Sequence, residues 1–460
     1  MFWRRPKQSA TPSPQRKQEP MPPGKSPAPP RASTRPQATG PSKEEPGSPG
    51  TQRTAHSGQD SKTERLEDQW WYHGLIPRAD IETLLQNEGD WLVRVTETED
   101  GTRVVVSVRW AKEIRHVLLR RLVKGWQLQG QVYQTPFELV KACYQQGISV
   151  NNQGAKLKTA VRKPSWMIPT SHVKMGHKLG SGVSGEVYDG WMKRPGQQAE
   201  VAVALKICRL AKTTEERETV MQEAKLMMRY QHPNVCRIYG VMADRPPLTL
   251  VMEKCPGGSL EQHLRQKKLE GGLSIDQRLR YCVEVARGVD YLTSVQCIHR
   301  DLASRNCLLG PAGEVKLSDF GISRSGTVYQ IRNPHVKLPV RWCAPESIAN
   351  GVFTPASDVW STGILMWEIW THAEQTPWAG KTARELAMGA LAGERLAIPW
   401  EVPEAVQQVI RECWELDSKK RVPIRQVRER LEKAARDRGV TLPPAPTNIP
   451  TNRHAAGKVY

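Results

Sequence analysis

The chain has 460 residues, of which 38% are hydrophobic and 25% charged, and it carries as many prolines (35) as glycines (35). This length favours two or three domains, and we find no apolar run near the ~18–20 residues that a membrane span requires. The formal net charge of +20 is spread along the chain and nothing resembles a nucleic-acid module. We therefore favour a solvated basic surface that attracts anionic partners over a specific nucleic-acid site.

The nine cysteines are scattered along the chain and form no C-x-x-C pair. This usage is typical of a reducing compartment, where free thiols serve as small hydrophobic side chains. We therefore expect a cytoplasmic protein without a transmembrane segment. Peripheral association with the inner face of the plasma membrane stays open as an alternative.

Residues 1–62 hold thirteen prolines among Ser, Gln, Lys and Thr, with almost no apolar side chains. Such a segment cannot bury enough surface to offset its ordering entropy, which predicts a disordered tail. Within it, Pro20–Lys25 fits the P-x-x-P-x-K pattern of polyproline ligands for SH3 domains. Proline-rich tails produce such matches by chance, so we favour a plain linker over an SH3 partner. Residues 434–460 are again rich in Pro and Ala, which predicts a flexible C-terminal tail.

Residues 63–160 carry the pattern of a small α+β domain. A helix is expected from Pro77 through Leu85, because proline is tolerated in a first helical turn. Runs of β-branched and aliphatic residues predict three strands, and a second helix follows them. In chain order these elements are expected at 91–95, 104–108, 116–119 and 137–144. A linker over 161–172 leads to the next domain.

Arg94 stands in the middle of an apolar strand, where burial without a partner is costly. Its side chain either reaches an edge of the sheet or waits for an anion. Trp71–Gly74 and Trp91–Arg94 resemble the opening and the F-L-V-R motif of an SH2 domain, with Trp in place of Phe. The resemblance implies binding of phosphotyrosine-containing proteins, since guanidinium forks suit bidentate contacts with phosphate. The implied pocket residues are Arg78, Arg94, Thr96 and His116.

A larger domain is expected over 173–433, rich in strands at first and helical afterwards. Residues 179–187 fit G-x-G-x-x-G-x-V, whose glycines let a hairpin bend over a nucleotide and bring N–H groups near its phosphates. Val203–Lys206 has the V-A-x-K form, in which a lysine meets the α- and β-phosphates. Glu223 follows on a predicted helix, placed to pair with Lys206.

The next motifs carry the chemistry of phosphoryl transfer. Residues 299–306 read His-Arg-Asp-Leu-Ala-Ser-Arg-Asn, with a carboxylate at Asp301 that can accept a hydroxyl proton. Asn306 and Asp319, the latter in a D-F-G triplet, would hold magnesium, and Ala344–Glu346 forms an A-P-E. Any one of these pieces could be an ordinary strand or turn. Six motifs in the right order at kinase-like separations resemble the bilobal protein kinase fold, with a β-rich lobe, a helical lobe and ATP between them.

Two features resemble tyrosine kinases in particular. Arg305 is displaced from the position where serine/threonine kinases usually carry lysine, which implies a cation that steadies the γ-phosphate for a larger acceptor. Leu338–Trp342 precedes the A-P-E, and its proline shapes a platform for tyrosine. Tyr329 lies in the activation segment, between the D-F-G and A-P-E motifs. The resemblance implies that it is an autophosphorylation site whose phosphate docks on Arg300 and orders this segment. An unmodified surface tyrosine is the alternative.

The kinase resemblance also implies cofactors and scaffold residues. ATP and Mg²⁺ are expected, with Mn²⁺ as an alternative metal. Asp358 is expected to brace the catalytic loop, residues 299–306, and Arg421 is expected to pair with Glu346. Ser184 stands where tyrosine kinases usually have Phe, so ATP affinity is expected to be weaker. The residues implied to contact the nucleotide are Leu179, Gly180, Gly182, Gly185, Val187, Ala204, Lys206, Met252 and Glu253.

One SH2 domain directly ahead of a tyrosine kinase is most similar to the Fes/Fer family, whose F-BAR and coiled-coil region is expected to be absent. The resemblance predicts a non-receptor protein-tyrosine kinase that transfers the γ-phosphate of ATP to tyrosine on protein substrates. It also implies recruitment and regulation by SH2 binding to phosphotyrosine, with SH2–kinase contact stabilising the active kinase. The alternative is an SH2-containing scaffold with a weakly active or inactive kinase domain, although every catalytic group is present.

Overall fold

The computed structural model describes residues 64–98, 101–182, 185–194, 196, 199–208, 213–319, 324–331 and 338–444. Our predictions for the tail 1–62, including Pro20–Lys25, and for residues 445–460 lie outside the described residues. The same holds for Ser184 and for Phe320 and Gly321 of the D-F-G triplet. Within the described part of the chain, no helix is both long and apolar enough to cross a membrane.

The first domain is an α+β unit with a four-stranded sheet in the order β3-β2-β1-β7 and a three-stranded sheet in the order β4-β5-β6. Its elements are η1 (Leu66–Asp68), α1 (Arg78–Leu84), β1 (Asp90–Thr98), β2 (Gly101–Trp110), β3 (Glu113–Leu118), β4 (Arg120–Leu122), β5 (Gly125–Leu128), β6 (Gln131–Tyr133), α2 (Pro136–Gln146) and β7 (Thr159–Ala160). The two helices and β1 to β3 were predicted. Strands β4 to β6 were not, because each is only three or four residues long and none of their residues is buried, so no run is long enough to show the apolar alternation that identifies a strand.

Local chemistry fixes the ends of α2. The Thr135 hydroxyl accepts from the Glu138 N–H at 3.1 Å, and the Glu138 carboxylate accepts from the Thr135 N–H at 3.3 Å. This reciprocal cap satisfies two donors that a helix start leaves without partners, and Pro136 costs nothing at the first position. Gly147 ends the helix with φ of +64°, a left-handed conformation that glycine adopts without strain.

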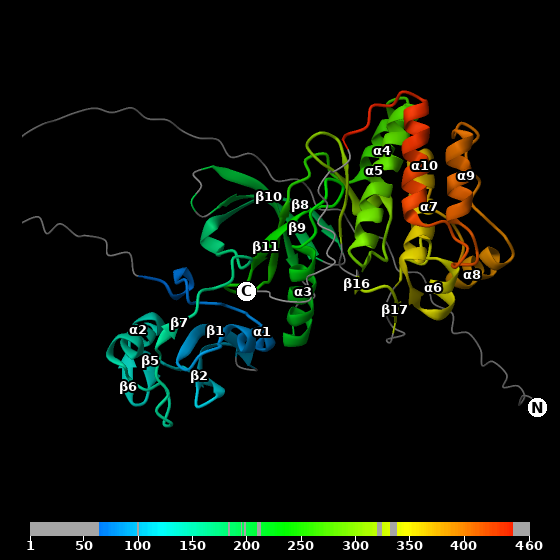
Figure 1. Ribbon diagram of the computed structural model, residues 1–460. Coiled ribbons are helices and arrows are strands. Elements are labelled where there is room, and N and C mark those ends of the chain that lie inside the picture. The colour runs from blue at the N-terminus through cyan, green and yellow to red at the C-terminus, as the bar shows by residue number, and fades with distance from the viewer. Residues whose placement is uncertain are drawn as a thin grey trace, which may run out of the picture. The chain divides into compact units, whose positions relative to one another are not determined.

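The second domain joins a five-stranded sheet in the order β11-β12-β10-β9-β8 to a helical part with three two-stranded ladders, β13-β16, β14-β15 and β17-β18 (Figure 1). The sheet part comprises η2 (Thr170–His172), β8 (Val173–Gly182), β9 (Gly185–Lys193), β10 (Glu200–Cys208), α3 (Thr214–Met227), β11 (Ile238–Met242) and β12 (Thr249–Glu253). The helical part comprises α4 (Leu260–Leu269), α5 (Ile275–Ser294), β13 (Cys297–Ile298), η3 (Ser304–Asn306), β14 (Cys307–Leu309), β15 (Val315–Leu317), β16 (Arg324–Ser325), β17 (Tyr329–Gln330), α6 (Pro345–Asn350), β18 (Val352–Phe353), α7 (Pro355–Trp370), α8 (Ala383–Leu391), α9 (Glu404–Cys413) and α10 (Ile424–Asp437).

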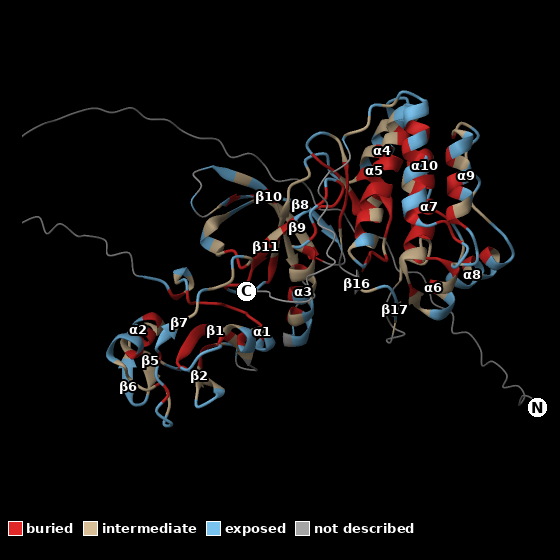
Figure 2. Cartoon of the chain, viewed as in Figure 1, coloured by how far each residue is buried: buried red, intermediate tan, exposed pale blue. Residues whose placement is uncertain are grey.

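The core of the helical part is built around α5 and α7, which are buried along most of their length (Figure 2). Helix α7 begins with Pro355 behind the cap residue Thr354, whose hydroxyl accepts from the Ser357 N–H. Helix α10 continues to Asp437, past the predicted domain limit at 433. It does so because Ala434 and Ala435 still pack in this core.

The apolar core of the first domain continues into the sheet part of the second. Met221 and Ala224 of α3 and Val241 of β11 are buried in the same cluster as the strand residues of the first domain. Lys225 of α3 also forms an ion pair with Asp80 of α1. Helix α3 therefore carries both the candidate Glu223 and a packed contact with the first domain.

Candidate active site and phosphate pocket

The register of the five-stranded sheet brings candidate nucleotide residues side by side. On β10, Val203 and Leu205 are fully buried, so the alternation of a strand turns Ala204 and Lys206 to the opposite face. Ala204 pairs with Met252 of β12. Two of the predicted nucleotide contacts, Ala204 and Lys206, therefore lie on the same face of β10.

The predicted glycine-rich hairpin is formed by β8 and β9. Gly180 pairs with Val187, and Gly182 with Gly185 at the end of the ladder. Gly185 has φ of +148°, where a side chain would strain the backbone. Leu179 precedes them on β8 with an exposed side chain. The two paired strands of the predicted hairpin are therefore present, and residues 183 and 184 at its tip lie outside the described residues.

Lys206 meets a carboxylate in this site. Its Nζ lies 2.5 Å from Oδ1 of Asp319, so the two candidates from β10 and the D-F-G triplet are brought together. Asp319 has φ of +57°, a left-handed conformation that Asp tolerates better than most residues. Glu223 lies on α3, and its pairing with Lys206 stays a prediction.

The catalytic loop places Arg305 against Asp301. The guanidinium of Arg305 forms an ion pair with the Asp301 carboxylate, and its central carbon lies over the Trp342 ring, 3.9 Å from the ring centroid. Stacking on an aromatic face and pairing with a carboxylate suit the planar guanidinium better than an ammonium group. Trp342, which we had read only as part of the tyrosine platform, therefore orients the predicted γ-phosphate cation.

A buried carboxylate on α7 braces the loop from below, as predicted. Asp358 accepts from the N–H groups of His299 at 2.7 Å and Arg300 at 3.0 Å. Burial raises the pKa of the Asp358 carboxyl to about 7, although those two N–H groups oppose the shift. Nε2 of His299 lies 3.1 Å from the Ser318 carbonyl oxygen, which joins the loop to the residue before Asp319.

A second buried carboxylate on α7 was missed in the sequence. Glu368 accepts from both the N–H and the hydroxyl of Ser304 at 2.9 Å. Burial raises the pKa of the Glu368 carboxyl to about 7. A lone Glu inside the apolar helix α7 was a signal that could have found it, because a buried carboxylate needs partners. Ser304 directly precedes Arg305, so Glu368 fixes the backbone that carries the cation.

Asn306 and Asp319 offer oxygen atoms that suit a hard divalent cation. Nδ2 of Asn306 donates to the Asp301 carbonyl oxygen at 2.8 Å, which holds the amide in one orientation. The Ser318 N–H donates to the Asn306 carbonyl oxygen at 2.9 Å, tying Asn306 to the residue before Asp319. One amide oxygen and one carboxylate beside bound phosphates are the ligand types that Mg²⁺ takes in phosphoryl-transfer sites. The residues present therefore fit the predicted metal.

Arg300 lies over two aromatic rings. Its guanidinium carbon lies 4.1 Å from the Tyr329 ring centroid and 4.7 Å from that of Phe353. The Tyr329–Phe353 pairing of β17 with β18 holds this arrangement. The predicted autophosphorylation site and its predicted receiver are therefore neighbours before any phosphate is added.

The predicted Arg421–Glu346 pair is present and bidentate. Nη1 and Nη2 of Arg421 lie 2.7 and 3.1 Å from the two carboxylate oxygens of Glu346. Arg421 also donates to the carbonyl oxygens of Ala356 at 2.7 Å and Glu415 at 2.9 Å. The pair connects the end of the activation segment to the start of α7.

In the first domain, the structure brings Arg94 and His116 together through a residue that the sequence did not single out. Arg94 Nε donates to the Ser107 hydroxyl at 3.3 Å, and that hydroxyl lies 2.9 Å from Nδ1 of His116. Burial and the guanidinium groups of Arg94 and Arg78 lower the pKa of His116 to about 4. His116 is therefore neutral near pH 7, and the positive charge of the site resides on arginines.

A pocket of about 180 Å³ contains three of the four predicted phosphate residues, namely Arg78, Arg94 and Thr96. His116 is not part of the lining and is connected to Arg94 through the Ser107 hydroxyl. The sequence did not predict the rest of the lining, which includes Glu97 from β1 and two residues of α3. The complete lining is Leu75, Ile76, Pro77, Arg78, Arg94, Val95, Thr96, Glu97, Arg217 and Glu218.

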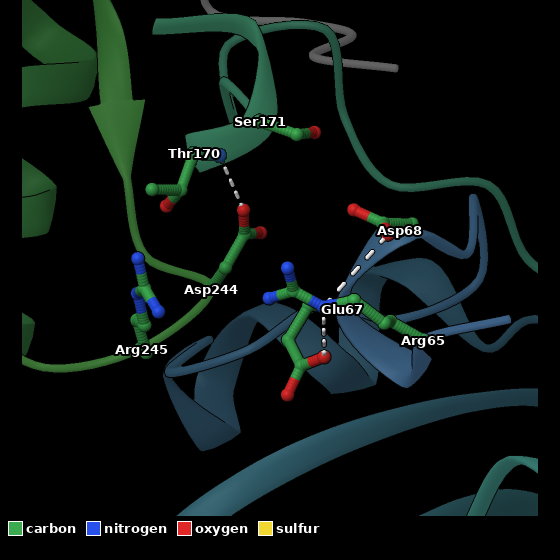
Figure 3. Close-up of a pocket in the computed structure, with 7 residues that line it drawn as sticks. All are labelled: Arg65, Glu67, Asp68, Thr170, Ser171, Asp244 and Arg245. Atoms are coloured by element: carbon green, nitrogen blue, oxygen red, sulfur yellow. Dashed lines mark hydrogen bonds and ion pairs between the residues drawn. The ribbon is translucent and has the colours of Figure 1, made fainter. Parts of the chain in front are cut away.

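Asp244 joins the linker to both domains (Figure 3). Its carboxylate points at the N–H of Thr170, which donates at 2.7 Å, and it pairs with Lys163 Nζ at 3.2 Å. The Tyr72 hydroxyl donates to the Asp244 carbonyl oxygen at 2.7 Å. These contacts hold the segment between the domains at several points, so displacement of the first domain would break a buried network.

Comparison with known families agrees with this architecture. Residues 173–431 match the family model described as protein tyrosine and serine/threonine kinase, and residues 71–142 match the SH2 domain. The matches, the five-stranded sheet and the helical part confirm the predicted order of an SH2 domain followed by a bilobal kinase fold. The finer domain limits that we expected stay predictions.

Relatives with similar sequences are kinases by name, and the first two below are tyrosine-protein kinases by name. The chain is 34% identical to the tyrosine-protein kinase transforming protein Fps of avian sarcoma virus (strain PRCII), covering 77% of this chain and 66% of that protein. It is 33% identical to human tyrosine-protein kinase Fer, covering 80% of this chain and 44% of Fer. It is 34% identical to Fer-related kinase 1 of Caenorhabditis elegans, covering 83% and 98%. The chain thus spans less than two thirds of Fps and Fer.

Proposed function

We propose that this chain, which belongs to the protein tyrosine and serine/threonine kinase family, is a non-receptor protein-tyrosine kinase that transfers the γ-phosphate of ATP to tyrosine hydroxyls. The observation that carries the proposal is the Arg305–Asp301 ion pair stacked on Trp342. It puts an oriented cation beside the carboxylate that would accept the hydroxyl proton.

In the proposed reaction, the tyrosine oxygen attacks the γ-phosphorus while the bond to the β-bridging oxygen breaks and ADP leaves. Asp301 orients the hydroxyl and accepts its proton. Arg305 neutralises charge on the γ-phosphoryl group, and Lys206 holds the α- and β-phosphates. Glu223 is proposed to keep Lys206 extended when the two pair.

The nucleotide and metal residues are proposed on the same grounds. The family uses ATP and a divalent metal in general, and we propose Mg²⁺, with Mn²⁺ as the alternative. Asn306 and Asp319 would hold the metal, which when bound neutralises charge on the phosphates. The proposed nucleotide contacts come from the hairpin, β10 and the end of β12, namely Leu179, Gly180, Gly182, Gly185, Val187, Ala204, Lys206, Met252 and Glu253.

The SH2 domain is proposed to bind phosphotyrosine on partner proteins through Arg78, Arg94, Thr96 and His116. The packed contact of α3 with the first domain supports the idea that a bound ligand stabilises the active kinase. Because α3 carries Glu223 and also packs on the SH2 domain, a ligand bound to the SH2 domain can shift the position of α3 and so favour the active conformation of the kinase domain.

Tyr329 is proposed as the autophosphorylation site. A phosphate there would add about −1.5 to −2 charges next to Arg300, whose guanidinium already lies over the ring. The ring would have to turn to present its phosphate to the guanidinium edge. The stack therefore keeps the unmodified tyrosine and its receiver together.

We propose domain limits of 63–160 for the SH2 domain and a linker over 161–172, and we extend the expected kinase domain of 173–433 to Asp437, where α10 ends. The cytoplasm is the proposed location, supported by nine cysteines that are all free thiols. Association with the inner face of the plasma membrane and an SH3 partner at Pro20–Lys25 are finer proposals of the same kind.

The test is incubation of the purified chain with Mg-ATP, beside Asp301→Asn, followed by mass spectrometry of phosphorylated residues. We expect phosphotyrosine at Tyr329 and on an added tyrosine polymer from the wild type only. Equal phosphotyrosine output from both proteins, or none from the wild type, would refute the proposed kinase activity. The alternative of an SH2-containing scaffold with an inactive kinase domain would then remain. Arg94→Ala tests the binding half, since it should abolish capture of phosphotyrosine peptides.

A further inference from the structure

The phosphate pocket of the SH2 domain is not built from that domain alone. Eight of its lining residues come from the stretch between Leu75 and Glu97, but Arg217 and Glu218 belong to α3 of the kinase domain. A ligand that fills this pocket therefore comes within reach of kinase side chains as well as Arg94.

Arg217 faces the pocket while paired to an acid of the SH2 domain. Its Nη1 lies 2.8 Å from Oε2 of Glu97, and the side chains are 9% and 30% exposed. Glu97 lies on β1, three residues beyond Arg94, and it lines the same pocket. A carboxylate oxygen thus already sits where an anion would meet the Arg217 guanidinium.

Phosphate is the stronger partner for that guanidinium. A guanidinium fork binds carboxylate and phosphate with the same bidentate geometry. The carboxylate of Glu97 carries one negative charge, whereas a phosphotyrosine carries about 1.5 to 2 at pH 7. In a partly buried site this difference favours exchange of Glu97 for the phosphate.

We propose that Arg217 is a phosphotyrosine-binding residue supplied by the kinase domain, and that the phosphate displaces Glu97 and is gripped by both domains at once. The inference rests on the proposed SH2 function. It also places the charge of the ligand on α3 itself, in the same helix as Glu223, so the occupied pocket contacts the kinase directly.

The interface offers a matched control. Lys225 also lies on α3 and pairs with an SH2 acid, Asp80, but neither of these residues lines the pocket. Replacing Lys225 removes one positive charge and one interdomain ion pair, as replacing Arg217 does, without removing a proposed phosphate contact.

The experiment titrates the full chain with phenyl phosphate, which presents the phosphate and ring without flanking residues, in 0.15 M salt by calorimetry. We expect Arg217→Ala to weaken binding at least tenfold and Arg217→Lys, which keeps the charge but loses the fork, at least threefold. Lys225→Ala should change it less than twofold. Glu97→Gln should tighten binding two- to fivefold, because it removes the competing carboxylate.

A purely structural ion pair gives a different pattern. Arg217→Ala and Glu97→Gln would then shift affinity in the same direction, or Arg217→Ala would match Lys225→Ala, and either result overturns the inference. Should Arg217→Ala fail to fold, Arg217→Lys and Glu97→Gln still decide. Arg94→Ala separates the two levels: if it leaves binding intact, or the wild type does not bind, the proposed SH2 function itself falls.

Discussion

Replacing Arg421 by Met should destabilise the kinase domain strongly. The side chain of Arg421 is 0% exposed and meets both carboxylate oxygens of Glu346. It also donates to the carbonyl oxygens of Ala356 and Glu415. Met fills similar space but satisfies none of these acceptors, and removal of one partner from a buried ion pair costs about 3–5 kcal/mol. For a domain of this size that corresponds to a fall of roughly 6–20 °C in Tm.

Calorimetry of the full chain measures the fall in Tm. Tryptophan fluorescence reports on the same region, because the guanidinium carbon of Arg421 lies 5.3 Å from the centroid of the Trp360 ring. Arg425 gives the matched control, since it pairs with Glu429 at 3.0 Å while its side chain is 76% exposed. Such a surface pair contributes about 0–1 kcal/mol, so Arg425→Met should leave the Tm within about 4 °C of the wild type.

A second variant tests where the cost arises. Most of it comes from the acid left without its partner, so adding Glu346→Gln to Arg421→Met should recover at least about 1 kcal/mol. The reasoning would be refuted if Arg421→Met lost less than about 1 kcal/mol or no more than Arg425→Met. Either result would mean that this buried pair is solvated or compensated in a way its contacts do not indicate.

Three further predictions concern the site. Glu368→Gln turns one of the two acceptors facing Ser304 into a donor, which should displace the backbone that carries Arg305. In steady-state kinetics we expect kcat to fall about tenfold or more with KM nearly unchanged, and an unchanged kcat would contradict the positioning role of Glu368. Because the pKa of His116 is held near 4, phosphotyrosine affinity should be flat from pH 8 to about 7 and weaken only as the phosphate gains its proton near pH 6. His116→Gln should leave the shape of that profile unchanged, and a new inflection would count against the neutral imidazole. Tyr329→Phe keeps the ring over Arg300, so the Tm should stay within about 2 °C while the rise of activity during preincubation with ATP disappears; a persistent rise would point to another site.

The sequence predicted those parts of the molecule whose signals are local. Runs of β-branched and aliphatic residues marked β1 to β3, and ordered motifs grouped Asp301, Arg305 and Asp319 in one site. Within that site the structure pairs Arg305 with Asp301 and Asp319 with Lys206. The short strands β4 to β6 were missed because three or four residues without a buried side chain are too few to form a recognisable pattern. Ser107 was missed because one hydroxyl in a run of valines is ordinary until its neighbours across the sheet are known.

Contacts between distant segments account for the other omissions. In the sequence, Arg217 is one of several charged residues in the first turn of a helix and would be expected to face solvent. Only the packing of α3 on the SH2 domain brings it to Glu97. Trp342 likewise gains its role from Arg305, far away in sequence. Such pairs leave no periodic pattern in either segment, so a single sequence gives no means of finding them.

The catalytic loop depends on one helix to an unusual degree. Its backbone N–H groups at His299, Arg300 and Ser304 donate to two carboxylates of α7, Asp358 and Glu368. The described strands that flank the loop, β13 and β14, are only two and three residues long. Their ladders end before these N–H groups, so the carboxylates of α7 take the place of backbone acceptors. The shape of the loop is therefore as stable as the position of α7 in the core. Since Arg421 donates to Ala356 at the start of that helix, a change there should loosen the catalytic loop before it unfolds the domain, and hydrogen exchange at Arg300 and Ser304 in Arg421→Met would reveal it.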